Sequence, residues 1–331
     1  MTRAATWTLT AGVLLFIAVL ASQGLPAVIA ALSLAGWGLV LVAIFHLLPL
    51  AIDAAAIRVL FEPSGEARGS MRDALLARWA GESANSLMPA GQIGGPVLMA
   101  RHLAQRGMPL PYAAAALTVS TTLQTFAQIG FALLGVALAG AQAGHLSQHA
   151  LRTSALIASG VLAVQVGGFY LMQRRGLFSK LMRAASRFSG KRNWSQLLNQ
   201  AQAIDTAVQL TYSRAGPVAA SFLLNLAGWL VGTGEVYLIL WLLGAPVSWL
   251  AALLLESLGQ AIRGAAFAIP GALGVQEGGY LLLAPLAGLT PEIALALSLA
   301  KRAREMLLGL PGLAYLHFSA PAVAVVPPAP P

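Results

Sequence analysis

Two stretches of the chain combine helix-breaking residues with polar side chains that could bind a ligand. The first reads NSLMPAGQIGGPVLMARHL at residues 85–103, and the second reads AIRGAAFAIPGALGVQEGGYLLL at residues 261–283. Proline lacks a backbone N–H and stops a helix, while glycine permits turns and a close approach of two backbones. The predicted helix-break residues are Pro89, Gly91, Gly94 and Gly95 in the first stretch and Pro270, Gly271 and Gly274 in the second.

Charged and amide side chains border both breaks, and these are the candidate substrate-binding residues. They are Glu82, Asn85, Arg101, Glu256, Arg263, Glu277 and Arg302. We expect Arg263 to hold an anionic headgroup, because a guanidinium stays charged and offers several donors to a phosphate. Glu277 is the candidate for its counter-charge or for a proton-coupled switch. Helix ends at the breaks would add free backbone N–H groups that favour an anion.

Structural roles for the same residues stay open. Glu82, Arg263 and Glu277 could form ion pairs that lock the broken segments, and the glycines could serve tight helix packing. Glu256 and Arg263 lie seven residues apart, on one face of a helix, and could share a partner. Arg101 and Arg304 could instead extend to the membrane surface. Further charges expected at membrane depth are Glu235, Lys301, Arg304 and Glu305.

The composition places these residues in a membrane protein. Of 331 residues, 58% are hydrophobic and only 9% are charged, whereas a soluble domain carries about 25% charged residues. The net charge of +9 comes from Lys and Arg clustered between apolar runs, so it indicates topology rather than nucleic-acid binding. The chain has no Cys, which excludes disulfides, thiol chemistry and metal sites built on Cys.

The elements that position these residues follow from the apolar runs. A span needs about 20 apolar residues, and six runs approach or exceed this length: 7–24, 30–52, 112–139, 153–172, 217–244 and 291–318. The two Pro/Gly segments cover 74–107 and 247–287. The predicted fold is an all-α polytopic membrane protein with about six full spans plus two re-entrant helical hairpins. Residues 1–318 form one membrane domain, and the Pro-rich tail 319–331 is expected to be disordered.

Residues 174–214 form a basic segment. They hold eight Lys or Arg residues against one acid, Asp205, with apolar residues such as Leu177 and Leu181 at helical spacing. This pattern predicts an amphipathic helix on the cytoplasmic membrane surface that contacts anionic lipid headgroups, or a plain topology anchor. Both termini should then be cytoplasmic, provided that the hairpins enter from opposite faces. If each hairpin were instead a pair of full spans, the number of extra crossings would be even, and both termini would still lie on the same side of the membrane.

The two halves therefore read as an inverted repeat of spans, a broken hairpin and a span. Transporters often have this arrangement, with the substrate at midplane between broken helices. Irregular backbone at membrane depth is stable only inside protein or beside a water-filled cavity. The polar clusters are accordingly predicted to form the floor of a cavity.

Catalytic chemistry is not indicated by the motifs. The five His residues are scattered without metal-ligand spacing, and neither HExxH nor a P-loop occurs. Ser83 or Ser86 beside Glu82 could be assembled into a nucleophilic site, but serine is common in packed spans. We therefore expect no enzyme, no metal and no cofactor. A transferase that modifies a lipid in the same cavity, and a scaffold for lipid synthesis, are the alternatives.

Three separated motifs resemble the lysylphosphatidylglycerol synthase transmembrane-domain (flippase-like) family. They are RWAGESANSLMPAGQIGGPVLMARHLAQRGMP at 78–109, IPGALGVQEGGYLLL at 269–283, and KRARE at 301–305. The first is closest to the hopanoid-associated subfamily. The resemblance implies an inner-membrane protein of bacteria that moves an amphiphilic lipid, of phospholipid or hopanoid type, between leaflets.

The resemblance has limits that bear on substrate and partners. The aminoacyl-transferase domain of the full-length synthases has no counterpart here, so synthase activity is not carried over. Pro96, Ser120 and Thr121 stand where members of the family carry charged residues. The expected partners are a membrane lipid substrate, anionic headgroups at 174–214, and either a second copy of the chain or lipid-synthesis enzymes. Nucleic acid is not an expected partner.

Overall fold

The computed structural model describes residues 33, 35–61, 69–88, 91–142, 160, 163–164, 166–188, 194–266, 269 and 272–319. Every element in this part of the chain is helical, as predicted. The first half contains α3 (Gly38–Arg58), α4 (Met71–Leu87), α5 (Gly91–Gln105) and α6 (Leu110–Gln142). The second contains α10 (Ala215–Leu242), α11 (Trp249–Ala265), α12 (Val275–Leu283), the short 3-10 helix η2 (Ala284–Ala287) and α13 (Pro291–Ser319). Between them lie α8 (Leu177–Phe188) and α9 (Ser195–Ser213).

Three helices are long and apolar enough to cross a membrane: α3, α6 over 110–138, and α10. They correspond to the predicted spans 30–52, 112–139 and 217–244. Helix α13 has 29 residues, but Lys301–Glu305 interrupt its apolar character. The predicted span 7–24 lies outside the described residues, as do half of 153–172 and the tail beyond Ser319.

Helices α4 and α5 form the first hairpin. Ser70 and Asp73 cap the start of α4 reciprocally, each side chain accepting a hydrogen bond from the other's backbone N–H. Helix α4 ends at Leu87, Met88 is extended, and α5 begins at Gly91. Gly94 and Gly95 therefore lie inside α5, and the prediction that they break the helix is wrong. Pro89 lies outside the described residues.

Gly95 instead permits close packing of the two hairpin helices. A Cβ at this position would meet the backbone oxygen of Gly81 and the side chain of Asn85. The Asn85 amide oxygen accepts a hydrogen bond from Gly95 N–H at 2.9 Å. Gly95 therefore allows α5 to fold back closely against α4.

Helices α11 and α12 form the second hairpin. The Ser248 side chain caps α11, and α12 begins after Gly274. Gly274 has a φ of +77°, a left-handed conformation that glycine adopts without a steric penalty. Gly274 is therefore a break residue as predicted, while Pro270 and Gly271 lie outside the described residues.

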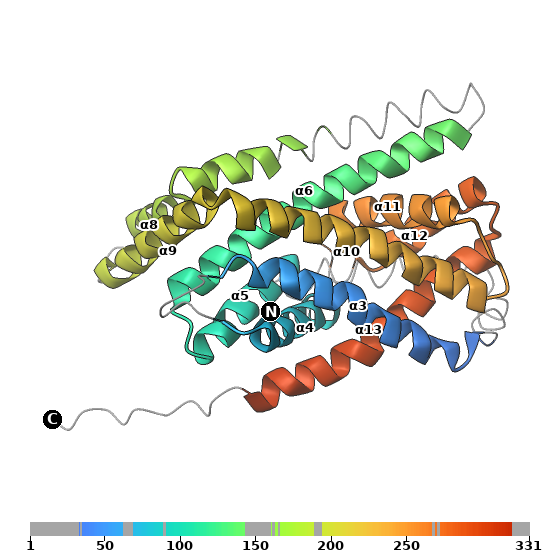
Figure 1. The fold of residues 1–331 in the computed structure, drawn as a ribbon, viewed down its shortest axis with the longest axis horizontal. Helices are drawn as coiled ribbons and strands as arrows, with labels where there is room; N and C mark the ends of the chain where they lie inside the picture. The colour runs from blue at the N-terminus through green and yellow to red at the C-terminus, as the bar shows by residue number, and fades with distance from the viewer. Residues whose placement is uncertain are drawn as a thin grey trace.

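The two hairpins begin at opposite ends of the molecule (Figure 1). Gly69, just before α4, lies near Phe61 at the end of α3 and Met108 after α5, so both ends of the first hairpin share this end. The second hairpin begins after α10, whose last residue Leu242 lies against Gly38 at the start of α3. Helices α3, α6, α10 and α13 surround both hairpins and connect the two ends (Figure 1).

The basic segment 174–214 forms a hairpin of two helices, and the first of them, α8, is the predicted amphipathic helix. Helix α9 packs on α6 and α8 packs on α9, and both lie at one end of the molecule (Figure 1). Asp205 is buried in α9 and accepts hydrogen bonds from the N–H groups of Phe178 and Ser179 at 3.0 and 2.8 Å. The segment's only acid therefore caps α8. Leu177 is buried, whereas Leu181 is 57% exposed, so part of the predicted apolar face stays uncovered.

Candidate functional site

A polar cavity of about 410 Å³ lies between the two halves. Its lining residues come from α3, α4, α5, α6, α10, α11 and α13, so both hairpins and all four long helices contribute. The ionisable lining residues are His46, Asp53, Arg78, Glu82, Glu235, Glu256, Arg263, Lys301, Arg304 and Glu305. Charged side chains within apolar helices carry a high free-energy cost unless they form ion pairs or are hydrated. The predicted cavity beside the broken helices is thus present.

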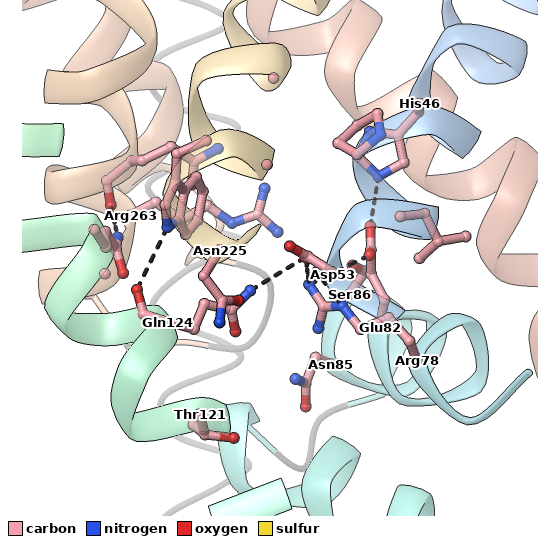
Figure 2. Close-up of a pocket in the computed structure, with 18 of the residues that line it drawn as sticks. His46, Asp53, Arg78, Glu82, Asn85, Ser86, Thr121, Gln124, Asn225 and Arg263 are labelled. Carbon is pink, nitrogen blue, oxygen red and sulfur yellow. Dashed lines mark hydrogen bonds and ion pairs between the residues drawn. The ribbon is translucent and has the colours of Figure 1, made fainter. Parts of the chain in front are cut away.

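One side of the cavity carries a network centred on Asp53 and Glu82 (Figure 2). Arg78 donates to Asp53 at 2.7 Å, and Gln124 of α6 donates to the same oxygen at 3.2 Å. Glu82 faces His46 at 2.9 Å and Arg304 at 3.3 Å. Because these residues come from α3, α4, α6 and α13, the first hairpin is tied to both halves of the molecule.

The other side is held by three ion pairs between the second hairpin and α13. Lys301 pairs with Glu256 at 2.5 Å, and Arg263 pairs with Glu305 at 2.5 Å. Arg302 bonds to Glu277 at 3.1 Å and to Glu305 at 3.2 Å. Glu256 and Arg263 therefore do not share a partner, although both bind side chains one turn apart on α13.

Four of the seven predicted substrate-binding residues line the cavity: Glu82, Asn85, Glu256 and Arg263. Glu277 lies behind the wall, where it accepts hydrogen bonds from Gly274 N–H at 2.7 Å and from Ser298. It pairs with Arg302, so it is not the counter-charge of Arg263. Arg101 is exposed on α5 and lines a separate, apolar groove. The structure does not bring Arg101 to the cavity.

Sequence reasoning did not single out His46, Asp53 or Gln124 as site residues, although all three line the cavity. Single polar residues in apolar helices give a weak signal. Arg304 was expected as an alternative to extend to the surface, but its side chain is only 6% exposed and points between Glu82 and Glu235. Pro96, Ser120 and Thr121, which depart from the resembled family's pattern, all line the cavity.

A repeated Glu-Ser pair gives the two hairpins matching contacts. Glu82-Ser83 lies in α4 and Glu256-Ser257 in α11, and each glutamate reaches the cavity and a cation of α13. Each serine packs under a glycine of a long helix in the other half. A Cβ at Gly312 of α13 would collide with Ser83, and a Cβ at Gly135 of α6 would collide with Ser257. This dipeptide is visible in the sequence and could have revealed the repeat more directly than the glycines did.

The cations of the cavity are all committed to carboxylates. Arg78, Arg263, Lys301 and Arg304 each have a carboxylate oxygen within 3.3 Å. The lining holds five acids, four such cations and His46. The arrangement therefore offers a nearly neutral, strongly hydrogen-bonding surface, and a charged ligand would have to exchange with existing pairs.

One of three comparisons with known proteins found a match. No curated protein and no solved structure matched the chain. The family model for the lysylphosphatidylglycerol synthase TM region matches residues 6–312 and so covers the cavity and both hairpins. The described helices include apolar ones long enough to cross a membrane. The chain is thus a membrane protein related to lipid metabolism, and it belongs to the lysylphosphatidylglycerol synthase TM region family.

Proposed function

We propose that this protein moves an amphiphilic lipid, of phospholipid or hopanoid type, between the leaflets of the bacterial inner membrane. The observation that carries the proposal is the charged cavity between two hairpins that begin at opposite ends of the molecule. A lipid headgroup needs a polar route across the apolar core, and its chains can remain in the surrounding hydrocarbon. A cavity lined by paired charges inside apolar helices provides such a route.

The distribution of basic residues supports a cytoplasmic location for one end. Arg58, Arg72, Arg106 and the basic helix α8 lie at the end where α3 stops and α4 starts. At the opposite end, described residues 236–250 and 284–294 carry one charge, Glu292. Positive residues favour the cytoplasmic side. Tyr315 near the end of α13 contacts Arg106, so α13 would end on the cytoplasmic side. The exposed Leu181 and the basic residues of α8 would there contact anionic lipid.

The contacts between elements support an inverted repeat. Each half runs as a long helix, a hairpin and a long helix, and the first helix of each hairpin packs on the last helix of the other half. Thus α4 packs on α13, and α11 packs on α6. In the proposal the hairpins are re-entrant, one from each face, and rocking of one half against the other would expose the cavity alternately.

Within the cavity we propose Arg263 as the main headgroup contact. Its guanidinium already donates to Glu305 and to Gln276, and a phosphate oxygen could replace one of these acceptors. Glu82, Asn85 and Glu256 would accept hydrogen bonds from hydroxyl or amine groups of the lipid. The proposal requires no covalent step, which distinguishes it from the transferase alternative.

The test uses purified protein in liposomes that contain fluorescent phosphatidylglycerol, with quenching of the outer leaflet as the readout. We expect the parent to expose inner-leaflet lipid, Arg263→Ala to lose this activity, and Arg101→Ala to keep it. Mass spectrometry of the same liposomes, and of cells with and without the gene, detects covalent change. A new lipid species that depends on the protein would overturn the transport proposal in favour of a transferase.

A further inference from the structure

His46 makes contacts that neutral histidine cannot satisfy. Its Nδ1 lies 2.5 Å from a carboxylate oxygen of Glu235, and its Nε2 lies 2.9 Å from a carboxylate oxygen of Glu82. A neutral imidazole carries one N–H, whereas an imidazolium carries two, and an ionised carboxylate only accepts. Two carboxylate partners therefore require one proton more than neutral His46 supplies.

Arg304 favours placing this proton on the ring. It lies 3.3 Å from an oxygen of Glu82 and 3.3 Å from an oxygen of Glu235. A guanidinium at this distance stabilises both carboxylates in their ionised form. With protonated His46, the group of two carboxylates, Arg304 and His46 is neutral. Without the proton, it carries one uncompensated negative charge, which is costly in a buried site.

The site also has a partner ready for the proton-free state. Arg304 Nη1 lies 3.2 Å from His46 Nε2. When Nε2 has lost its proton it becomes an acceptor, and Arg304 can donate to it while Glu82 moves away. Nε2 thus has one partner suited to each protonation state. The proton can therefore leave Nε2 without leaving that nitrogen unpaired in the buried site.

The charged groups around His46 come from three of the helices that pack against α3. Helix α4 supplies Glu82 and Arg78, α10 supplies Glu235, and α13 supplies Arg304 and Lys301. On α3 itself, about two turns further along, lies Asp53, which is bonded to Arg78. Helix α6 supplies the uncharged Gln124. Protonated His46 balances the charges of Glu82, Glu235 and Arg304, so a proton fits this site.

Water in the cavity can deliver the proton, because His46, Glu82, Glu235 and Arg304 all line it. We propose that His46, held between Glu82 and Glu235, binds one exchangeable proton, and that this proton is the coupling ion for lipid movement. The coupling rests on the proposed function. Binding forms one N–H bond from a cavity proton, and release returns that proton to water. Glu82 belongs to the first hairpin and Arg304 to the last helix, so release changes contacts between the two halves.

The proton site is tested by ¹⁵N NMR of protein labelled at histidine, with His46→Gln identifying the signal. At a pH of about 7.5 an ordinary histidine, with a pKa of about 6.5, is mostly neutral. We expect His46 to give an imidazolium signal there and to become neutral at higher pH. His102 is the internal control, because it is buried and its Nε2 lies 3.5 Å from the Tyr315 hydroxyl.

Substitutions of the carboxylates sharpen this test. Glu82→Gln and Glu235→Gln should each convert His46 to the neutral form at the same pH, and Glu82→Asp should preserve the imidazolium. The Asp variant provides an answer even if a Gln variant does not fold. A neutral His46 in the parent would overturn the proton site. So would an imidazolium signal that persists in both Glu82→Gln and Glu235→Gln when these variants are folded.

The coupling is tested in liposomes that carry a pH gradient, with fluorescent phosphatidylglycerol and an internal pH dye. We expect the gradient to bias lipid distribution and lipid movement to carry protons, and His46→Gln to lose both effects. Lipid movement that ignores the gradient would overturn the coupling while leaving the proposed function intact. Failure to move any lipid, with the imidazolium still present, would overturn the proposed function and its coupling but not the proton site.

Discussion

The two hairpins carry the same Glu-Ser pair in different environments. Glu256 in the second hairpin is 4% exposed, with one oxygen on Lys301 and the other on Gln260. Glu82 in the first hairpin is 24% exposed and has His46, Arg304 and Arg78 within 4 Å. The second site is a closed pair, and the first is an open network whose members can exchange partners. We infer that the second hairpin acts as a fixed wall and that the first carries the change of state.

The largest expected effect follows from breaking the closed pair. Lys301→Met leaves Glu256 buried without its cation, and removing one partner of a buried ion pair costs about 3–5 kcal/mol. Chemical unfolding in mild detergent should show this loss of unfolding free energy. Glu82→Gln should cost less, because other partners and water remain. Adding Glu256→Gln to Lys301→Met should restore much of the stability; equal losses for Lys301→Met and Glu82→Gln would contradict the comparison.

The break of the second hairpin depends on backbone conformation. Gly274→Ala places a Cβ at a φ of +77°, which costs about 1–2 kcal/mol. Gly278→Ala in α12, the helix that begins after Gly274, is the matched control, since a Cβ there meets nothing within 4 Å. Thermal unfolding should show a lower midpoint for Gly274→Ala than for Gly278→Ala. If both variants unfold like the parent, the left-handed break is absent.

In the first hairpin, a hydrogen bond between Asn85 of α4 and Gly95 of α5 holds the two helices together beside the break. Asn85→Ala removes the acceptor for Gly95 N–H, and loss of a comparable helix cap costs about 1 kcal/mol. Asn85→Asp keeps an acceptor and should retain most of the stability. The check is the unfolding free energy of both variants, and an Asp variant as unstable as the Ala variant would show that the bond does not hold this break.

The smallest effect is expected at Arg101, the predicted site residue that lies away from the cavity. Arg101→Ala should change the unfolding free energy by no more than about 0.5 kcal/mol and leave lipid movement at the parental rate. The liposome assay measures this rate directly. A loss comparable to that of Arg263→Ala would mean that the groove on α5, rather than the cavity, contacts the lipid.

The sequence predicted the two hairpins and part of the site because both depend on local chemistry. Pro and Gly clusters marked the two hairpins, and charges next to them identified Glu82, Glu256 and Arg263. His46 and Asp53 could not be found in this way, because their partners lie on helices far away in sequence. Glu235, for example, is 189 residues from His46. Glu277 and Arg304 also lie elsewhere than predicted. The packing of the helices determines which charged side chains become neighbours, and this packing cannot be read from local sequence.

The most direct test of the central claim is to obstruct the cavity in this Cys-free chain. Thr121 is exposed and lines the cavity, while Gly130 on the same helix is exposed and does not line it. Thr121→Cys and Gly130→Cys would each be reacted with a bulky thiol reagent, and lipid movement in liposomes would be measured before and after. We predict that modification stops movement in Thr121→Cys and leaves Gly130→Cys unchanged. Undiminished movement in fully modified Thr121→Cys would contradict the account.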